Sequence, residues 1–231
     1  MTSARILSPE NVLAPGASGR AVIGPNAVTR LFAALGRAGL GDVARDIYLK
    51  AGVREWLDQA PTAMVDEIRV AKIHQGVRDA LPPEQARAIL VEAGTATADY
   101  LLANRIPAPF RRFIAWTPRG MGLWLFLAAI RRHAWTFVGT GRFTANIGAP
   151  TTLEIRGNPF CAGERRAAPV CDWHAAVFER LFGEMIHPSA RVREVACEAR
   201  GDECCRFTLK WSPLDADPAK SARWDPKRRR K

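Results

Sequence analysis

The spacing of apolar residues changes along this 231-residue chain, and the change limits the folds open to it. As far as Ala134 the apolar residues recur every three or four positions, as they do in amphipathic helices. From Trp135 onward they fall in short runs separated by glycine and proline, as antiparallel strands require. Helices followed by strands predict an α+β fold with an antiparallel sheet, rather than a parallel doubly wound sheet.

The clearest helical patterns lie in Asp66–Leu81 and Pro83–Asn104, which each carry one apolar stripe. Shorter helices are expected between Pro25 and Leu57. Met121–Ala134 is apolar on nearly every face, which predicts complete burial. The expected C-terminal order is three strands, a helix and two strands: Trp135–Val138, Arg142–Ile147, Thr151–Arg156, Val170–Met185, Ala190–Glu198 and Cys204–Trp211.

Composition divides the chain into four parts. Residues 1–24, rich in Pro, Gly and Ser, are expected to form a flexible arm, and residues 25–118 a helical region. The antiparallel-sheet domain is expected over residues 119–211, and a basic flexible tail over residues 212–231.

The net charge of +11 is unevenly placed, because five of the basic residues form the run Lys227–Lys231. No nucleic-acid-binding module accompanies that run, so we expect no nucleic-acid partner. An anionic membrane surface or an acidic partner enzyme suits the charge better. Residues 1–19 lack the apolar core of an export signal, and the longest apolar stretch, Met121–Ile130, is half a membrane span. We therefore expect a soluble, cytoplasmic protein, and leave peripheral membrane contact and a homodimer open.

Five cysteines, an odd number, argue against a disulfide framework. Cys171 is expected at a helix start, Glu194 and Cys197 on one strand, and Cys204 and Cys205 at the start of the next. A hairpin can bring these side chains together, and three thiolates with one carboxylate would suit zinc. Because neighbours on a strand point to opposite faces, only one of Cys204 and Cys205 should face the site. The alternative is that the cysteines are simply small buried apolar residues.

The run from Glu194 to Phe207, Glu-Val-Ala-Cys-Glu-Ala-Arg-Gly-Asp-Glu-Cys-Cys-Arg-Phe, resembles the end of the 4-vinyl reductase domain. That small-molecule-binding α+β domain also occurs in phenol- and toluene-sensing transcriptional activators. The likeness covers residues 121–211, and the whole chain is similar to the members of this family in bacteriochlorophyll biosynthesis. By spacing, the resemblance implies a structural zinc on Cys171, Glu194, Cys197 and Cys205. Cys161, in a loop rich in Gly and Pro, is expected to be a free thiol.

The resemblance also implies a tetrapyrrole, carrying magnesium, as ligand or substrate. A tetrapyrrole needs aromatic faces, basic groups for its propionates and an imidazole for a central magnesium. Candidates are Trp124, Trp135, Arg131 and Arg132, with His133 as the axial ligand. The alternative is that the aromatic residues are core and the arginines a solvated face. Weaker axial candidates are His74, His174 and His187, of which His174 is expected to be exposed.

Whether the chain is an enzyme is left open, because saturating a vinyl group needs a source of hydride or electrons. The sequence has no G-x-G-x-x-G motif and no compact ferredoxin-like cysteine run. The first hypothesis is a carrier or accessory factor for chlorophyll-pathway enzymes such as magnesium chelatase or the following methyltransferase. The alternatives are an 8-vinyl (4-vinyl) reductase acting on divinyl protochlorophyllide or chlorophyllide, and a stand-alone small-molecule sensor.

Overall fold

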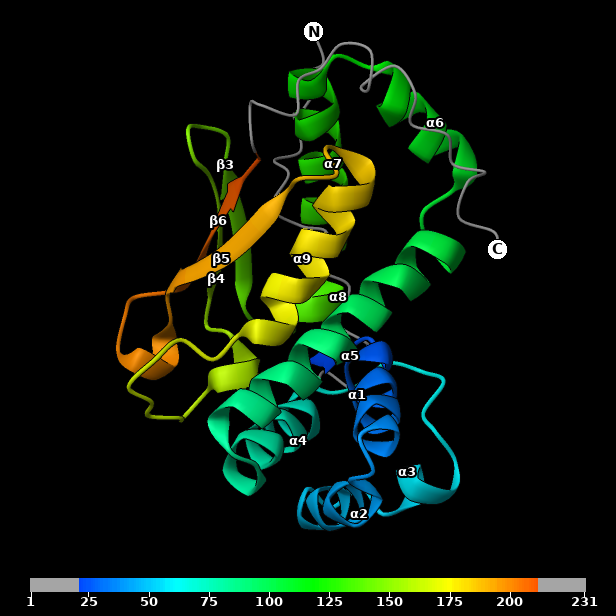
Figure 1. The fold of residues 1–231 in the computed structure, drawn as a ribbon, viewed down its shortest axis with the longest axis vertical. Helices are drawn as coiled ribbons and strands as arrows, with labels where there is room; N and C mark the ends of the chain where they lie inside the picture. The colour runs from blue at the N-terminus through cyan, green and yellow to red at the C-terminus, as the bar shows by residue number, and fades with distance from the viewer. Residues whose placement is uncertain (1–20, 212–231) are drawn as a thin grey trace, which may run out of the picture.

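A computed structural model describes residues 21–211, so residues 1–20 of the expected arm and the expected tail lie outside the described residues. The described part is an α+β fold, as predicted. A four-stranded antiparallel sheet forms one side and the helices stack against it (Figure 1). One continuous hydrophobic core contains residues from the N-terminal helices, from α9 and from the sheet.

The N-terminal half is helical, as the apolar spacing predicts. The Asp66 carboxylate caps the helix that follows it by accepting hydrogen bonds from the backbone N–H groups of Ile68 and Arg69, at 2.9 and 3.2 Å. The helices in chain order are α1 (Asn26–Arg37), α2 (Gly41–Lys50), α3 (Glu55–Asp58), α4 (Glu67–Ala80), α5 (Pro83–Asn104), α6 (Ala108–Trp116) and α7 (Arg119–His133).

The sheet consists of two hairpins joined side by side, in the order β3-β4-β6-β5. Every neighbouring pair in this sheet is antiparallel. The helix between the hairpins is α9, and a single 3-10 turn, η1, precedes it. The bounds are β3 (Arg142–Asn146), β4 (Thr151–Arg156), η1 (Pro159–Cys161), α9 (Asp172–Met185), β5 (Arg191–Ala196) and β6 (Cys205–Lys210).

The strand predicted over Trp135–Val138 is wrong, because these residues form the short helix α8 (Trp135–Val138). Their aromatic and β-branched side chains favour a strand locally. Ala134 nevertheless keeps helical angles, and the chain runs on from α7 until Gly139, with φ +54°, ends the turn. A small pair of antiparallel strands was also missed. In it β1 (Val22–Ile23), from within the expected arm, pairs with β2 (Val65–Asp66).

Helix α9 lies between the sheet and α5 (Figure 1). On the sheet side, the Phe178 ring packs edge-on against Phe207 of β6, with centroids 5.4 Å apart. On the other side, the α5 backbone approaches closely at Gly94, where an added Cβ would lie 2.5 Å from the carbonyl oxygen of Trp173. A residue with a side chain at position 94 would therefore push α5 and α9 apart.

Helix α7 packs through one face only, so the expectation that it is buried all round is wrong. The buried face includes Phe126, whose ring packs edge-on against Phe182 of α9. Met121 and Trp124 are exposed on the opposite face. None of the described helices combines the length and apolar character that crossing a membrane requires.

We predict that Gly94→Ala destabilises the fold by about 1–3 kcal/mol, the usual range for overpacking a filled core. The obstacle is the Trp173 carbonyl, a backbone atom that cannot rotate away. Gly183→Ala, within α9 and with open space at its Cβ position, is the matched control. It should leave stability unchanged or raise it by up to about 1 kcal/mol. Urea unfolding of both variants makes the comparison, and equal stabilities would contradict the close approach.

Candidate metal centre and ligand-binding face

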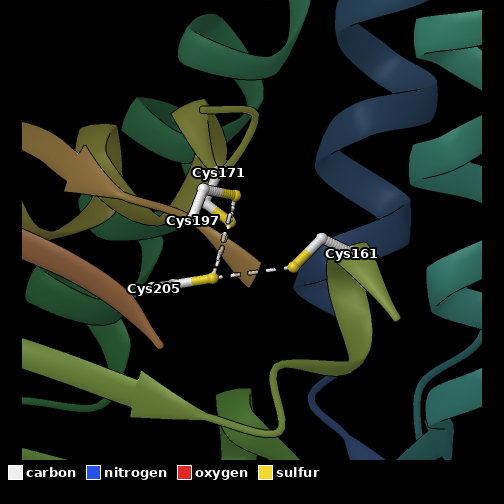
Figure 2. Close-up of side chains that lie close together, drawn as sticks. All are labelled: Cys161, Cys171, Cys197 and Cys205. Carbon is white, nitrogen blue, oxygen red and sulfur yellow. Dashed lines mark hydrogen bonds between the residues drawn. The ribbon is translucent and has the colours of Figure 1, made fainter. Parts of the chain in front are cut away.

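Four buried cysteine sulfurs converge between the sheet and the start of α9, within 4.8 Å of one another (Figure 2). The Cys205 sulfur lies 3.5 Å from that of Cys171, 3.6 Å from that of Cys161 and 3.9 Å from that of Cys197. The sulfurs of Cys171 and Cys197 are 3.9 Å apart. The structure thus brings together the three predicted cysteines and adds Cys161, which had been expected to be a free thiol outside the site.

Each cysteine comes from a different element. Cys161 ends η1, Cys171 immediately precedes α9, Cys197 follows β5, and Cys205 begins β6. The turn between β5 and β6 uses Gly201 at φ +95°, a left-handed conformation that glycine adopts without strain. This turn folds the hairpin back and brings the second and third predicted cysteines together.

Asn158 connects the η1 loop to the sulfurs. Its side-chain NH₂ lies within hydrogen-bonding distance of the sulfurs of Cys171 and Cys205, at 3.3 and 3.4 Å. The Glu198 carboxylate fixes the loop by accepting hydrogen bonds from the backbone N–H groups of Gly157 and Asn158, at 2.6 and 2.7 Å. A buried amide that donates to sulfur favours the ionised, acceptor form of the thiol.

A buried ion pair anchors the Cys161 loop to α4. The Arg78 guanidinium donates to the Glu164 carboxylate at 2.5 Å and to the Phe160 carbonyl at 2.6 Å, and both charged side chains are buried. Arg166 also pairs with Glu164, at 2.9 Å. Cys161 therefore joins the cluster through tertiary contacts with a helix some 80 residues away in sequence, which local spacing could not reveal.

The electrostatics of the cluster depend on how many thiols are ionised. The pKa of Cys197 is lowered, because the thiols of Cys161, Cys171 and Cys205 donate hydrogen bonds to its sulfur. The pKa values of Cys171 and Cys205 are raised, because their thiols take part in these hydrogen bonds and burial disfavours further charge. One thiolate is therefore favoured in the absence of a cation, and a bound divalent cation would reverse this by stabilising all four.

Glu194 lies beside the cluster but not among the four sulfurs. One carboxylate oxygen accepts a hydrogen bond from the Cys171 backbone N–H at 2.8 Å, at the N-terminus of α9. The other is buried without a partner among the described residues. Burial, followed by the nearby Cys197 charge, raises the pKa of Glu194 to about 10, so the carboxyl group is neutral at pH 7 without a cation.

The four-cysteine group can hold a metal ion. Thiolates about 2.3 Å from a central zinc would be about 3.8 Å apart at the corners of a regular tetrahedron. The four sulfur–sulfur separations given above, 3.5–3.9 Å, bracket that value. A cluster of several iron atoms needs its thiolates farther apart, so the geometry suits a single ion.

Two further predicted residues lie elsewhere. Cys204 is buried but outside the sulfur group, in keeping with strand alternation. His174 is buried rather than exposed and packs edge-on against Phe160 at 4.4 Å. Burial lowers the pKa values of His74 and His174 to about 3 and about 4, so both rings are neutral inside the core.

The residues predicted to contact a tetrapyrrole lie on or just beyond α7. Trp124 is 58% exposed and Trp135 44% exposed. Arg131, Arg132 and His133 are exposed as well. Positions 124, 131 and 135 differ by 7 and 11 residues, so at 3.6 residues per turn they share one helical face. Arg131 also donates a hydrogen bond to the Ala145 carbonyl of β3, which ties this outer face to the edge of the sheet.

Residues 151–211, which include both hairpins apart from β3, match the 4-vinyl reductase domain family. The described fold and this match define the chain as a protein with a 4-vinyl reductase domain. More particularly, the chain belongs to the family of the bacteriochlorophyll synthase 23 kDa chain. It is 45% identical over 188 residues to the protein of that name from Cereibacter sphaeroides, covering 81% of this chain and 89% of the relative. The protein of the same name from Rhodobacter capsulatus is 40% identical, over 81% of this chain and 86% of the relative.

Two solved structures are more distantly similar. The phenol-responsive sensory domain of the transcription activator PoxR, with phenol, shares 15% identity at a TM-score of 0.48, over 71% of this chain and 86% of that chain. A vinyl-4-reductase family protein from Methanocaldococcus jannaschii shares 12% identity at a TM-score of 0.34, over 63% of this chain and 92% of that chain.

We predict that Arg78→Met destabilises the protein by about 3 kcal/mol, the low end of the range for breaking a buried pair, since Arg166 still pairs with Glu164. The loosened loop should also make Cys161 react faster with a thiol reagent. Lys50→Met, which breaks an exposed pair with Asp46, is the control and should cost less than about 1 kcal/mol. Urea unfolding and timed thiol labelling test both effects. Unchanged labelling in Arg78→Met would show that the ion pair does not hold the loop.

Proposed function

We propose that this protein acts in bacteriochlorophyll biosynthesis as a carrier or accessory factor. It binds a magnesium-tetrapyrrole intermediate and presents it to pathway enzymes such as magnesium chelatase or the methyltransferase that follows. Family membership supports the pathway, since both relatives carry bacteriochlorophyll synthase in their names. The observation that carries the ligand is the exposed outer face of α7.

That face offers the groups a tetrapyrrole requires. Trp124 and Trp135 provide aromatic surfaces, Arg131 and Arg132 provide positive charge for the propionates, and His133 provides an imidazole for magnesium. An open face suits a protein that must hand its ligand on. The small hollow beside Phe32, by contrast, has a volume of about 30 Å³, whereas sites for small molecules usually occupy several hundred.

The vinyl reductase alternative has less support in the described residues. A reductase needs a hydride or electron donor, and nicotinamide and flavin cofactors are commonly held by a glycine-rich turn. The candidate turn, Gly139-Thr140-Gly141, links α8 to β3, and its Thr140 N–H and hydroxyl both donate to the Glu67 carboxylate at 2.7 Å. An acidic side chain thus occupies the position where a phosphate would bind. The stand-alone sensor is the remaining alternative.

We predict that the purified protein binds magnesium protoporphyrin or divinyl protochlorophyllide with a shifted Soret band and without turnover. His133→Ala should alter the pigment spectrum while leaving the melting temperature unchanged, because the imidazole is exposed. Arg45→Gln, an exposed position on α2, is the control and should not alter the spectrum. Conversion of the vinyl group by the chain alone, with a reductant, would favour the reductase. Failure to bind any tetrapyrrole would overturn both proposals and leave the sensor.

For the metal centre, we propose a structural zinc held by Cys161, Cys171, Cys197 and Cys205. Glu194, predicted as a ligand from the resemblance, is assigned the neighbouring role of fixing the start of α9 through the Cys171 N–H. The zinc would neutralise the buried thiolates and link the η1 loop, α9 and the β5–β6 hairpin. Its chemistry there is structural, because four protein ligands leave no open coordination position.

We predict one zinc per chain, lost in Cys161→Ser and retained in Glu194→Gln. Cys204→Ser is the matched control, since its thiol is equally buried but outside the sulfur group, and it should keep the metal. Elemental analysis measures the zinc content. In cobalt-substituted protein, the intensity of the thiolate-to-metal absorption separates four sulfur ligands from three. Zinc loss in Glu194→Gln with retention in Cys161→Ser would restore the carboxylate as the fourth ligand.

A further inference from the structure

We propose that the elbow between α6 and α7 docks the protein onto a lipid bilayer that contains anionic lipids. The α6–α7 elbow is defined as Arg112, Phe113, Trp116, Arg119 and Met121. It adjoins the outer face of α7 but shares none of its candidate tetrapyrrole residues. The proposal therefore does not depend on pigment binding.

The first observation is a long stretch of chain without negative charge. From Tyr100 to Leu153 there is no aspartate and no glutamate, but there are seven arginines. This stretch contains α6, α7, α8 and β3. The positive charge of the described protein is therefore concentrated on one group of neighbouring elements, as attraction to an anionic surface requires.

The second observation is the exposure of large apolar side chains among those arginines. Trp116 is 89% exposed, Phe113 55% and Met121 48%. Phe113 and Trp116 are three positions apart and so share a face of α6. Trp116 ends α6 and Met121 lies in the first turn of α7, so both adjoin the connecting residues of the elbow. Large apolar groups that cluster on a surface mark an interaction site.

The third observation is that the elbow arginines are free of internal partners. Within residues 21–211, no salt bridge involves Arg112 or Arg119, and both side chains are exposed. In contrast, Arg37, Arg69, Arg78, Arg166, Arg180 and Arg206 all pair with carboxylates. The charges at the elbow remain available to an external anion.

An anionic bilayer fits these three observations together. Tryptophan and phenylalanine insert at the boundary between headgroups and acyl chains, while arginines beside them contact lipid phosphates. Figure 1 shows α6 projecting at one end of the molecule, beyond the core formed by α5 and α9. Such a projecting helix can reach a flat surface, whereas a compact protein partner would be matched better by a concave surface.

The test is co-sedimentation of the full chain with vesicles of phosphatidylcholine plus phosphatidylglycerol, and with vesicles of phosphatidylcholine alone. We expect binding to the anionic vesicles, weakened in about 1 M salt, where the screening length falls to about 3 Å. Phe113→Ala/Trp116→Ala should weaken binding roughly tenfold, because two interfacial anchors are lost. Arg112→Gln/Arg119→Gln should weaken it by about twentyfold, at about fivefold per arginine.

Matched controls separate the elbow from general surface properties. Ile68→Ala removes a 61% exposed apolar side chain on α4, and Arg45→Gln/Arg54→Gln removes two exposed arginines outside the elbow. Both should bind vesicles like the original chain, and circular dichroism should show all variants folded. Absence of vesicle binding would overturn the proposal. So would binding that survives both elbow variants but disappears when Lys227–Lys231 are neutralised. Pigment titration of the elbow variants without vesicles keeps the two proposals separate, because it should be unchanged.

Discussion

The close packing of α9 between α5 and the sheet is the constraint on which the rest of the structure depends. The Trp173 carbonyl is held against the backbone of α5 because position 94 is a glycine. Phe178 fixes the opposite side of α9 against the sheet. With both sides of the helix occupied, its N-terminal end has one position, and Cys171 is delivered to the sulfur cluster. The β5–β6 hairpin then needs only one glycine turn to supply Cys197 and Cys205.

The sulfur cluster joins parts of the chain that are remote in sequence. Arg78 belongs to α4, yet it holds the loop that carries Cys161 beside β6. Four buried thiols have little hydrophobic or hydrogen-bonding reason to converge, since sulfur is a weak donor and acceptor. They do have an electrostatic reason, because one divalent cation stabilises several thiolates at once. Convergence therefore supports metal binding more strongly than burial alone.

Regular, self-contained elements could be predicted from the sequence, and elements defined by distant contacts could not. Pro83–Asn104 is long and begins at proline, so its helix was predictable at both ends. Trp135–Val138 has strand-like residues, but four residues are too few to outweigh a helix that already reaches Ala134. The hairpin cysteines were predictable because strand spacing brings them together. Cys161 was not, because its position depends on an ion pair with α4.

The two faces of α7 show why its apolar sequence was misleading. An apolar side chain inside the core and one reserved for an external partner look the same in sequence, because burial drives both. Phe126 is satisfied by Phe182, whereas Trp124 stays in water among the described residues. Leaving a large aromatic group exposed sacrifices stability that burial would provide. Arginines without acidic neighbours add repulsion on the same elements. Both costs are removed together only by a partner that is both apolar and anionic, and an amphipathic pigment and a lipid surface share that chemistry.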